Sequence, residues 1–289
     1  MQKHFSITQS TGDIARETIL KEVVFGLVDE MLEFREAVNS RFTPALDYRM
    51  TLQADTEITP LAKEEGARAD YQTASWFDVS GTLQTYQNAL MFTDETKARQ
   101  MGNVQISTSL DACARGLAKK KDYNIMTALT AGVGDTHSAS ATWDDAVASD
   151  PAQDIAEAIS SMLANSNMSA RQIADVKLFV PASVWPFLSK PVQVGEIQKE
   201  IRTWAQDAYN ISFYPTRLLT TNCLALVKSD RTAIIIEHDG SKLPSIETFR
   251  NHGVGDGYIF TQAFDAKVMP NSKTDATSNL IYNITGVSA

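Results

Sequence analysis

The sequence predicts an α+β protein, in which long helices and alternating strands precede a separate α/β block. Residues 104–131 carry apolar side chains at helical spacing, and a helix of that length would span roughly 40 Å. Phe77, Val79 and Leu83 alternate with polar residues, which is typical of a strand with one solvated face. Residues 152–237 alternate between strand-like and helix-like patterns, and this alternation indicates an α/β unit.

The composition favours a folded protein that does not bind nucleic acid through a basic face. The chain has 289 residues, of which 43% are hydrophobic and 21% charged, so one large domain or two smaller ones can bury a core. The formal net charge is −9, and nucleic-acid-binding proteins usually carry a basic surface. Lys119, Lys120 and Lys121 form the densest basic cluster, and we expect them on a solvated helix face.

Cysteine content and hydropathy indicate a protein made in the cytosol without a membrane anchor. Cys113 and Cys223 are the only cysteines and neither belongs to a CxxC motif, so we expect two buried thiols in a reducing compartment. The N-terminus has no apolar signal-peptide core, and no apolar run approaches the roughly 20 residues of a membrane span.

The first third of the chain predicts a helix, a charged loop and a long strand. Residues 13–38 form an amphipathic pattern after the possible N-cap Asp13. Its predicted apolar stripe consists of Ile19, Val23, Leu27, Met31 and Phe34. Residues 48–54 predict a strand and residues 55–75 a mixed-charge loop. Residues 77–92 predict one continuous strand that ends at a helix start, Thr93-Asp94-Glu95.

The remaining elements follow in the same way. The helix 104–131 should bury Ile106, Leu110, Cys113, Leu117, Ile125 and Leu129. We expect residues 132–147 to be a loop and Asp150-Pro151 to begin a helix that ends near residue 165. Further strands are predicted at 176–180, 211–214, 223–227, 233–237, 245–250, 258–269 and 280–284, with a short helix after Pro181 and a longer one over 197–208.

Residues that could carry chemistry are scattered, and we predict no catalytic, cofactor-binding or metal-binding residues. The four histidines show no metal-ligand spacing. His238-Asp239 is expected to be a turn at the end of a strand, and the glycines at 253–257 are expected to join two strands. Trp76 and Trp143 lie in polar surroundings, and either one could anchor an interface or pack in the core.

The order of these elements resembles the major capsid proteins of tailed double-stranded DNA viruses, which have the Hong Kong 97-like fold. The stretch 64–95, EEGARADYQTASWFDVSGTLQTYQNALMFTDE, is similar to the extended loop of that family and its return strand. Residues 104–131 resemble its spine helix. Residues 176–190, VKLFVPASVWPFLSK, and 255–270, GDGYIFTQAFDAKVMP, resemble steps of its axial domain and of its peripheral sheet.

The resemblance implies a division of the chain into five parts. They are an N-terminal arm (1–46), an extended loop with its stem strands (47–92), a peripheral domain with the spine helix (93–140), an α/β axial domain (141–242) and return strands of the peripheral domain (243–289). The loop would contact a neighbouring subunit. The residues expected in this contact are Lys63, Glu64, Glu65, Arg68, Asp70, Tyr71 and Trp76.

The implied function is self-assembly into an icosahedral shell that encloses double-stranded DNA without sequence-specific binding. The implied partners are further copies of the chain in hexamers and pentamers, together with scaffolding, portal and decoration proteins. Assembly in the host cytoplasm would place the chain in the virion, without a cofactor or a membrane. Two alternatives stay open at this point: an encapsulin-type shell around protein cargo, and a soluble α/β hydrolase-like enzyme that uses His238.

Overall fold

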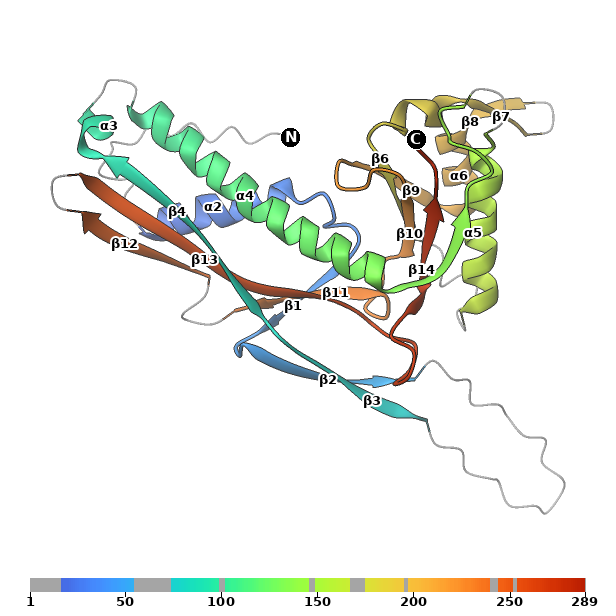
Figure 1. Cartoon of the computed structure of the whole chain (residues 1–289), viewed down its shortest axis with the longest axis horizontal. Helices are drawn as coiled ribbons and strands as arrows, with labels where there is room; N and C mark the ends of the chain where they lie inside the picture. Colours follow the sequence, from blue (N-terminus) through green and yellow to red (C-terminus); the bar gives the residue numbers. More distant parts are fainter. Residues whose placement is uncertain are drawn as a thin grey trace, which may run out of the picture.

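One long helix lies along a β-sheet and leads into a second lobe built on its own sheet (Figure 1). The structure is a computed structural model, and it describes residues 17–54, 74–98, 102–145, 149–166, 175–194, 197–239, 244–251 and 254–288. Every structural statement below concerns these residues.

The first sheet is organised around one long strand, β13 (Gly255–Val268). On one edge it pairs with β4 (Gln84–Thr93), and on the other with β12 (Ser245–Asn251) and β11 (Ala233–His238). The strand β1 (Asn39–Thr43) pairs in parallel with β11 and completes the five described strands of this sheet. Helices α2 (Glu17–Met31) and α4 (Gly102–Ala131) cover one face, where they share a core with Phe92, Tyr258 and Phe260.

The predicted spine-type helix is confirmed as α4, and so is its buried face. All six apolar residues assigned to that face are buried: Ile106, Leu110, Cys113, Leu117, Ile125 and Leu129. The expectation for the lysine cluster is wrong for one member, because Lys121 is 1% exposed. Its ammonium group lies 2.9 Å from Glu237 Oε2, so a buried ion pair replaces the water expected around it.

Helix α2 is shorter than predicted at its C-terminal end and buries different residues. It ends at Met31, and Phe34 follows in a buried turn. The fully buried positions are Val24 and Val28, whereas the predicted stripe residues Leu27 and Met31 are only partly buried. The reason is that α2 packs on both α4 and β12, so a broader part of its circumference is in contact than a single stripe would cover.

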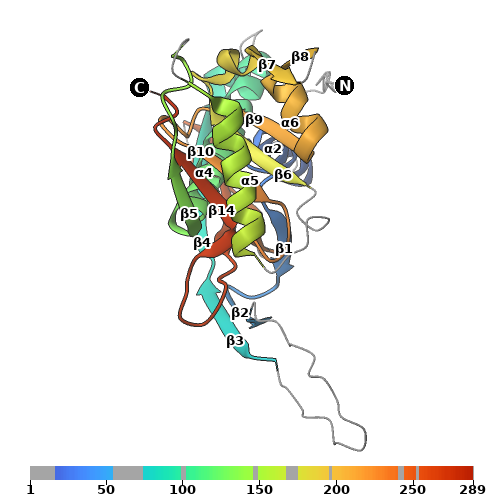
Figure 2. The same cartoon turned by 90° about the vertical axis from the view of Figure 1, so that its right-hand side faces the viewer.

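The predicted strand 77–92 is in fact two strands that serve two different sheets. β3 (Trp76–Thr82) pairs with β2 (Asp47–Gln53) in a separate two-stranded sheet, and β4 pairs with β13. The change occurs at Leu83, whose N–H donates to the carbonyl oxygen of Leu46 at 2.7 Å. Figure 2 shows the resulting β2–β3 hairpin extending away from both lobes.

The second lobe consists of a sheet with strand order β5-β14-β10-β6-β9 and two helices, α5 (Pro151–Asn165) and α6 (Ile201–Tyr209). The strands are β5 (Val133–Ser138), β6 (Val176–Pro181), β9 (Ile211–Thr216), β10 (Cys223–Val227) and β14 (Ser278–Thr285). Shorter elements are α3 (Asp94–Ala98), the 3₁₀ helix η1 (Trp185–Ser189) and the strands β7 (Pro191–Val194) and β8 (Ile197–Glu200). Asp150 is confirmed as the N-cap of α5, since its side chain accepts from the N–H of Gln153.

Two sequence expectations are wrong in this lobe. Residues 133–138 form a strand, although they were expected in a loop, and residues 197–200 are a strand before α6. The boundary predicted between residues 242 and 243 does not separate the two sheets. β11 lies before it but pairs with β13 in the first sheet, whereas β14 lies after it but pairs with β10 in the second. Pairing partners far apart in sequence cannot be read from local patterns.

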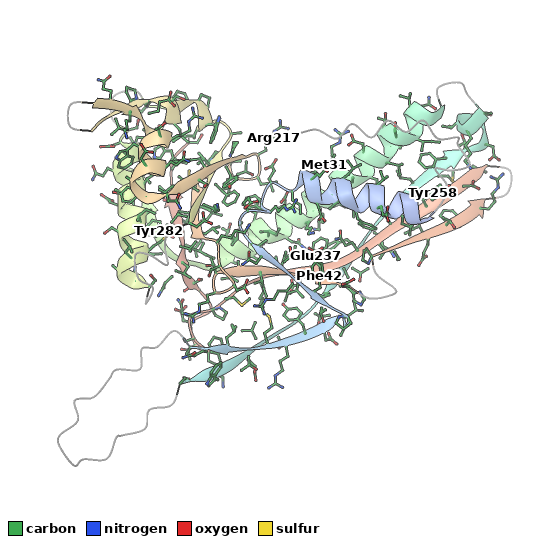
Figure 3. The ribbon with its side chains drawn as sticks, turned by 180° about the vertical axis from the view of Figure 1, so that it is seen from behind. Met31, Phe42, Arg217, Glu237, Tyr258 and Tyr282 are labelled. Atoms are coloured by element: carbon green, nitrogen blue, oxygen red, sulfur yellow. The ribbon has the colours of Figure 1, made fainter. Side chains whose placement is uncertain are left out.

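A shared core joins the two lobes, and its centre is Phe34. Its ring stacks on Phe179 of β6, with 4.6 Å between centroids, and Phe179 stacks in turn on Tyr214 of β9. Ile125 and Leu129 of α4 and Phe264 of β13 belong to the same cluster. Figure 3 labels Met31 at the end of α2 and Arg217 in the second lobe, on either side of this junction. The body is therefore one packed unit from which the hairpin projects.

Candidate assembly interface

The β2–β3 hairpin has one apolar and one polar face. Its strands pair from Asp47 opposite Thr82 to Gln53 opposite Trp76. The side chains of Met50, Leu52, Ala54, Phe77 and Val79 form a small apolar cluster on one face. This cluster lets the hairpin keep its shape while it extends beyond the body, because a two-stranded hairpin without such a cluster is marginal in water.

The polar face carries a ladder of cross-strand contacts. Arg49 pairs with Asp78, and Thr51 Oγ1 donates to the same carboxylate at 2.7 Å. Nearer the body, Thr82 Oγ1 donates to Asp47 at 2.7 Å. The hydrogen bond from the Arg49 guanidinium, with a further one from Thr51, holds the pKa of Asp78 below its usual range. Since these groups are exposed, they fix the strand register more than they add stability.

Of the predicted contact residues, Trp76 alone belongs to the described part of the chain. Lys63, Glu64, Glu65, Arg68, Asp70 and Tyr71 lie outside the described residues. Trp76 is described, and its side chain is 61% exposed on the polar face, opposite Gln53. Ala54 and Ser75 close the described part of the hairpin, because the N–H of Ala54 donates to the carbonyl oxygen of Ser75 at 2.8 Å. Residues 55–73 therefore connect two neighbouring points at this end.

A second surface, which the sequence reasoning missed, lies on the first sheet opposite α2 and α4. Met91, Gly257 and Phe249 are aligned across β4, β13 and β12. Met91 is 48% and Phe249 46% exposed. A Cβ atom at Gly257 would lie 2.1 Å from the Phe249 ring, so the ring lies directly across this glycine. The alternation of side chains along a strand could have predicted this surface. Leu90 and Phe92 face the core, so Met91 between them faces outward.

Charged residues join α3 to the end of the same sheet. Arg250 donates to Asp94 at 2.8 and 2.9 Å and to Asp256 at 2.8 Å, and Lys97 also pairs with Asp256. Hydrogen bonds from Lys97 and then from Arg250 lower the pKa of Asp256. All four groups are partly exposed, which suits a contact surface better than a reaction site.

Trp143, by contrast, belongs to the core of the second lobe. It is fully buried, and its Nε1–H donates to the buried carboxylate of Asp154 at 2.8 Å. The same carboxylate accepts from the N–H of Ser140 at 3.1 Å. These bonds hold the segment after β5 against α5, so of the two tryptophans left open by the sequence only Trp76 is available to a neighbour.

The groups with possible chemistry are not assembled into a reaction site. Burial raises the pKa of Cys113 to about 11 and that of Cys223 well above its usual range, which disfavours both reactive thiolates. His238 ends β11 opposite Thr43 of β1. Among the described residues, no group of three or more His, Cys, Asp or Glu side chains could hold a metal ion. None of the described helices is long and apolar enough to cross a membrane.

Comparison with known proteins decides between a capsid protein, an encapsulin-type shell protein and a hydrolase-like enzyme. The sequence pattern described as phage capsid protein matches residues 77–278, well over half of the chain. The chain belongs to the phage capsid protein family. The match runs from β3 of the hairpin through α4 and both sheets to the first residue of β14. Comparison with curated protein sequences finds no match.

Solved structures of shell proteins share the fold of this family member. The capsid of Myoviridae phage XM1 has a TM-score of 0.62 and 14% identity over 88% of this chain and 90% of its own. A virus-like particle from Pyrococcus furiosus has a TM-score of 0.63 and 8% identity over 93% and 98%. The holo-SrpI encapsulin complex of Synechococcus elongatus PCC 7942 has a TM-score of 0.56 and 9% identity over 87% and 85%.

The fold and the family together establish the function at the level of the shell. The phage capsid protein has the Hong Kong 97-like fold, which was expected from the resemblance. The encapsulin match shows that the fold alone does not separate a virus from a nanocompartment, and the family match does. The chain is a phage capsid protein: a structural protein, not an enzyme, whose copies form the shell of the virion.

Proposed function

We propose that the capsid protein builds its shell from hexamers and pentamers in which the β2–β3 hairpin, extended by residues 55–73, reaches a neighbouring subunit. The observation that carries this proposal is the projection of the hairpin beyond both lobes, with Trp76 exposed near its open end. Lys63, Glu64, Glu65, Arg68, Asp70 and Tyr71 are the further contact residues in this proposal. Their mixed charge would set the register against a neighbour, each pair contributing little by itself.

The body of the subunit would act as the rigid part of the assembly. The core around Phe34 connects α4, β6 and β13, so the two lobes pack against each other through shared buried side chains. Of the expected N-terminal arm, residues 1–46, the structure describes residues 17–46. Within it, α2 packs on α4 and β12, and β1 is a strand of the first sheet. Within the described residues, the hairpin is therefore the element that projects from this rigid body.

The charge of the chain bears on how the shell would hold its contents. The 26 Lys and Arg residues are outnumbered by 35 Asp and Glu residues, and this net charge of −9 disfavours tight binding to phosphates, so we propose that double-stranded DNA is enclosed without sequence-specific binding. Scaffolding, portal and decoration proteins are the further partners of this proposal. The family match favours this content over protein cargo, which the encapsulin similarity alone would also allow. Electron microscopy of purified particles separates the two, because a packaged genome with a portal supports the first and a cargo enzyme supports the second.

The contact itself is tested by shortening the hairpin. Deletion of residues 57–74 would leave two residues between Ala54 and Ser75, which already share a hydrogen bond. Changing these two to Asn-Gly provides the turn that suits a two-residue hairpin loop. We expect folded subunits of about the wild-type stability that form no shells in negative-stain images or light scattering. An unchanged particle yield would show that the loop makes no necessary contact. A Gln53→Ala variant, altered at the end of the hairpin but with the loop intact, serves as the control.

A further inference from the structure

Among the described residues, one side-chain hydrogen bond ties the hairpin to the body. Tyr48 Oη, on β2, donates to Asp265 Oδ2, on β13, at 2.6 Å. The other side-chain hydrogen bonds of the described hairpin join its own two strands, at Arg49, Thr51 and Asp78 and at Asp47 and Thr82. Those bonds keep the hairpin together but leave its direction relative to the body unspecified.

Gly81 gives the tyrosine its path to β13. It lies opposite Tyr48 in the register of the hairpin. A Cβ atom at this position would lie 2.4 Å from the phenolic oxygen and 2.6 Å from Cζ, closer than any side chain tolerates. The missing side chain therefore lets the ring cross the partner strand. Burial and the hydrogen bond to Asp265 both raise the pKa of Tyr48, which keeps the phenol protonated as a donor.

Apolar contacts hold the base of the hairpin but do not orient it. Tyr48 and Leu83 pack on Ile234, Ile236 and Ala263 of the first sheet. Such contacts are non-directional, whereas a hydrogen bond prefers a narrow range of angles. Further along β2, Met50 and Leu52 pack against the same cluster, and two clefts lie between the rest of the hairpin and the body. A cleft of about 330 Å³ runs beside Leu52 and Trp76, and another of about 560 Å³ runs beside Phe77 and Lys267.

We propose that Tyr48, Gly81 and Asp265 are positioning residues for shell assembly, which fix the angle at which the hairpin leaves the body. The hairpin strands have seven residues each, so at about 3.3 Å per residue the lever is roughly 20 Å long. A rotation of about 10° at its base would move its end by roughly 4 Å, enough to break or form side-chain contacts with a neighbour. The angle therefore selects the curvature that the assembled subunits favour. This inference rests on the proposed contact between the hairpin and a neighbouring subunit.

The test measures particle diameters for variants that remove single groups. Tyr48→Phe deletes only the phenolic oxygen, and we expect folded subunits whose particles have at least twice the wild-type spread of diameters in electron micrographs. Thr51→Val removes one hydroxyl bond inside the hairpin and leaves the tie intact, so its spread should equal that of the wild type. Asp265→Asn keeps an oxygen acceptor for the phenol and should also resemble the wild type, whereas Asp265→Leu should resemble Tyr48→Phe.

The outcomes separate this inference from the function on which it rests. Equal spreads for Tyr48→Phe and the wild type, or an equally wide spread for Thr51→Val, would overturn the positioning role. If Tyr48→Phe gives no soluble subunits, the Asp265→Asn and Asp265→Leu pair decides, and equal spreads overturn the inference. Loss of shells in the loop deletion together with an unaltered Tyr48→Phe variant would remove the positioning role alone. Shells formed by the loop deletion would instead remove the proposed contact.

Discussion

At the scale of residues, two neighbours on α4 connect parts of the chain that no local pattern could have joined. Asp122 accepts from the N–H groups of Glu33 and Phe34, both at 2.9 Å, and so caps the turn after α2. Lys121 reaches Glu237 on β11. In the sequence these residues form part of the run KKKD, which is typical of a solvated helix face. Their partners lie some ninety residues away or more, so only the fold shows that both are buried.

Replacement of Asp122 tests this cap. Asp122→Ala leaves the buried N–H of Phe34 and the partly buried N–H of Glu33 without this acceptor, and the buried group alone costs about 1–3 kcal/mol. Burial raises the pKa of Asp122, so the ionised carboxylate itself costs stability at neutral pH, and this cost falls as the pH drops through the raised value. We therefore expect a net loss of about 1–3 kcal/mol at pH 7 in urea denaturation of unassembled subunits.

The control for this variant lies on the same helix. Asp111 pairs with Arg115 on the solvated side, and Asp111→Ala should cost about 0.5 kcal/mol or less. Equal losses for the two aspartates would mean that the cap after α2 contributes nothing to stability.

At the scale of elements, the sequence predicted the helices and strands that have a periodic or continuous apolar pattern. It missed the strands that depend on pairing with a distant segment. Helix α4 and the buried strands β6, β10 and β11 have strong periodic or apolar patterns, and all were predicted. β5, with the sequence VGDTHS, has neither pattern, and it is a strand because it pairs with β14. The division of residues 77–92 at Leu83 was missed for the same reason, since both halves alternate and only their partners differ.

The residues of the candidate interface also differ in how far the sequence could point to them. The sequence left open whether Trp76 anchors an interface or packs in the core, and the structure shows that it is 61% exposed. The contacts proposed for residues 63–71 stay a prediction. Tyr48 and Asp265 were not singled out, because an isolated tyrosine and an isolated aspartate 217 positions apart carry no signal until the fold brings them together.

Two glycine substitutions of opposite effect test this account of the elements. A Cβ atom at Gly134 in β5 would lie 2.4 Å from the backbone oxygen of Ser278, so Gly134→Ala must push β5 away from β14. We expect a loss of about 1–3 kcal/mol in thermal unfolding. A Cβ atom at Gly26 in α2 would meet no other atom within 4 Å, and Gly26→Ala should gain about 0.5–1 kcal/mol from helix propensity. A stability gain at Gly134 would contradict the close pairing of β5 with β14.

At the scale of the whole molecule, the two sheets behave as one body because they share the core around Phe34. The segment after α2 provides this residue, Asp122 of α4 holds its backbone, and Phe179 of the second lobe stacks on its ring. Glu33, just before it, accepts from Thr216 Oγ1 of the second lobe at 2.7 Å. On the positioning role proposed above, a shell subunit with this rigid body presents its hairpin to each neighbour at a defined angle.

The coupling between the lobes predicts how the subunit unfolds when the shared core is damaged. Phe34→Ala should cost about 3–5 kcal/mol, because it empties a fully buried position and removes the stack on Phe179. It should also turn a single unfolding transition of the unassembled subunit into two, since each sheet keeps its own helices while the contact between them is lost. Differential scanning calorimetry measures both effects.

Phe42→Ala, at a side chain that is 65% exposed on the neighbouring strand β1, should cost about 0.5 kcal/mol or less and keep one transition. A single transition with a small loss in Phe34→Ala would show that the lobes are coupled elsewhere.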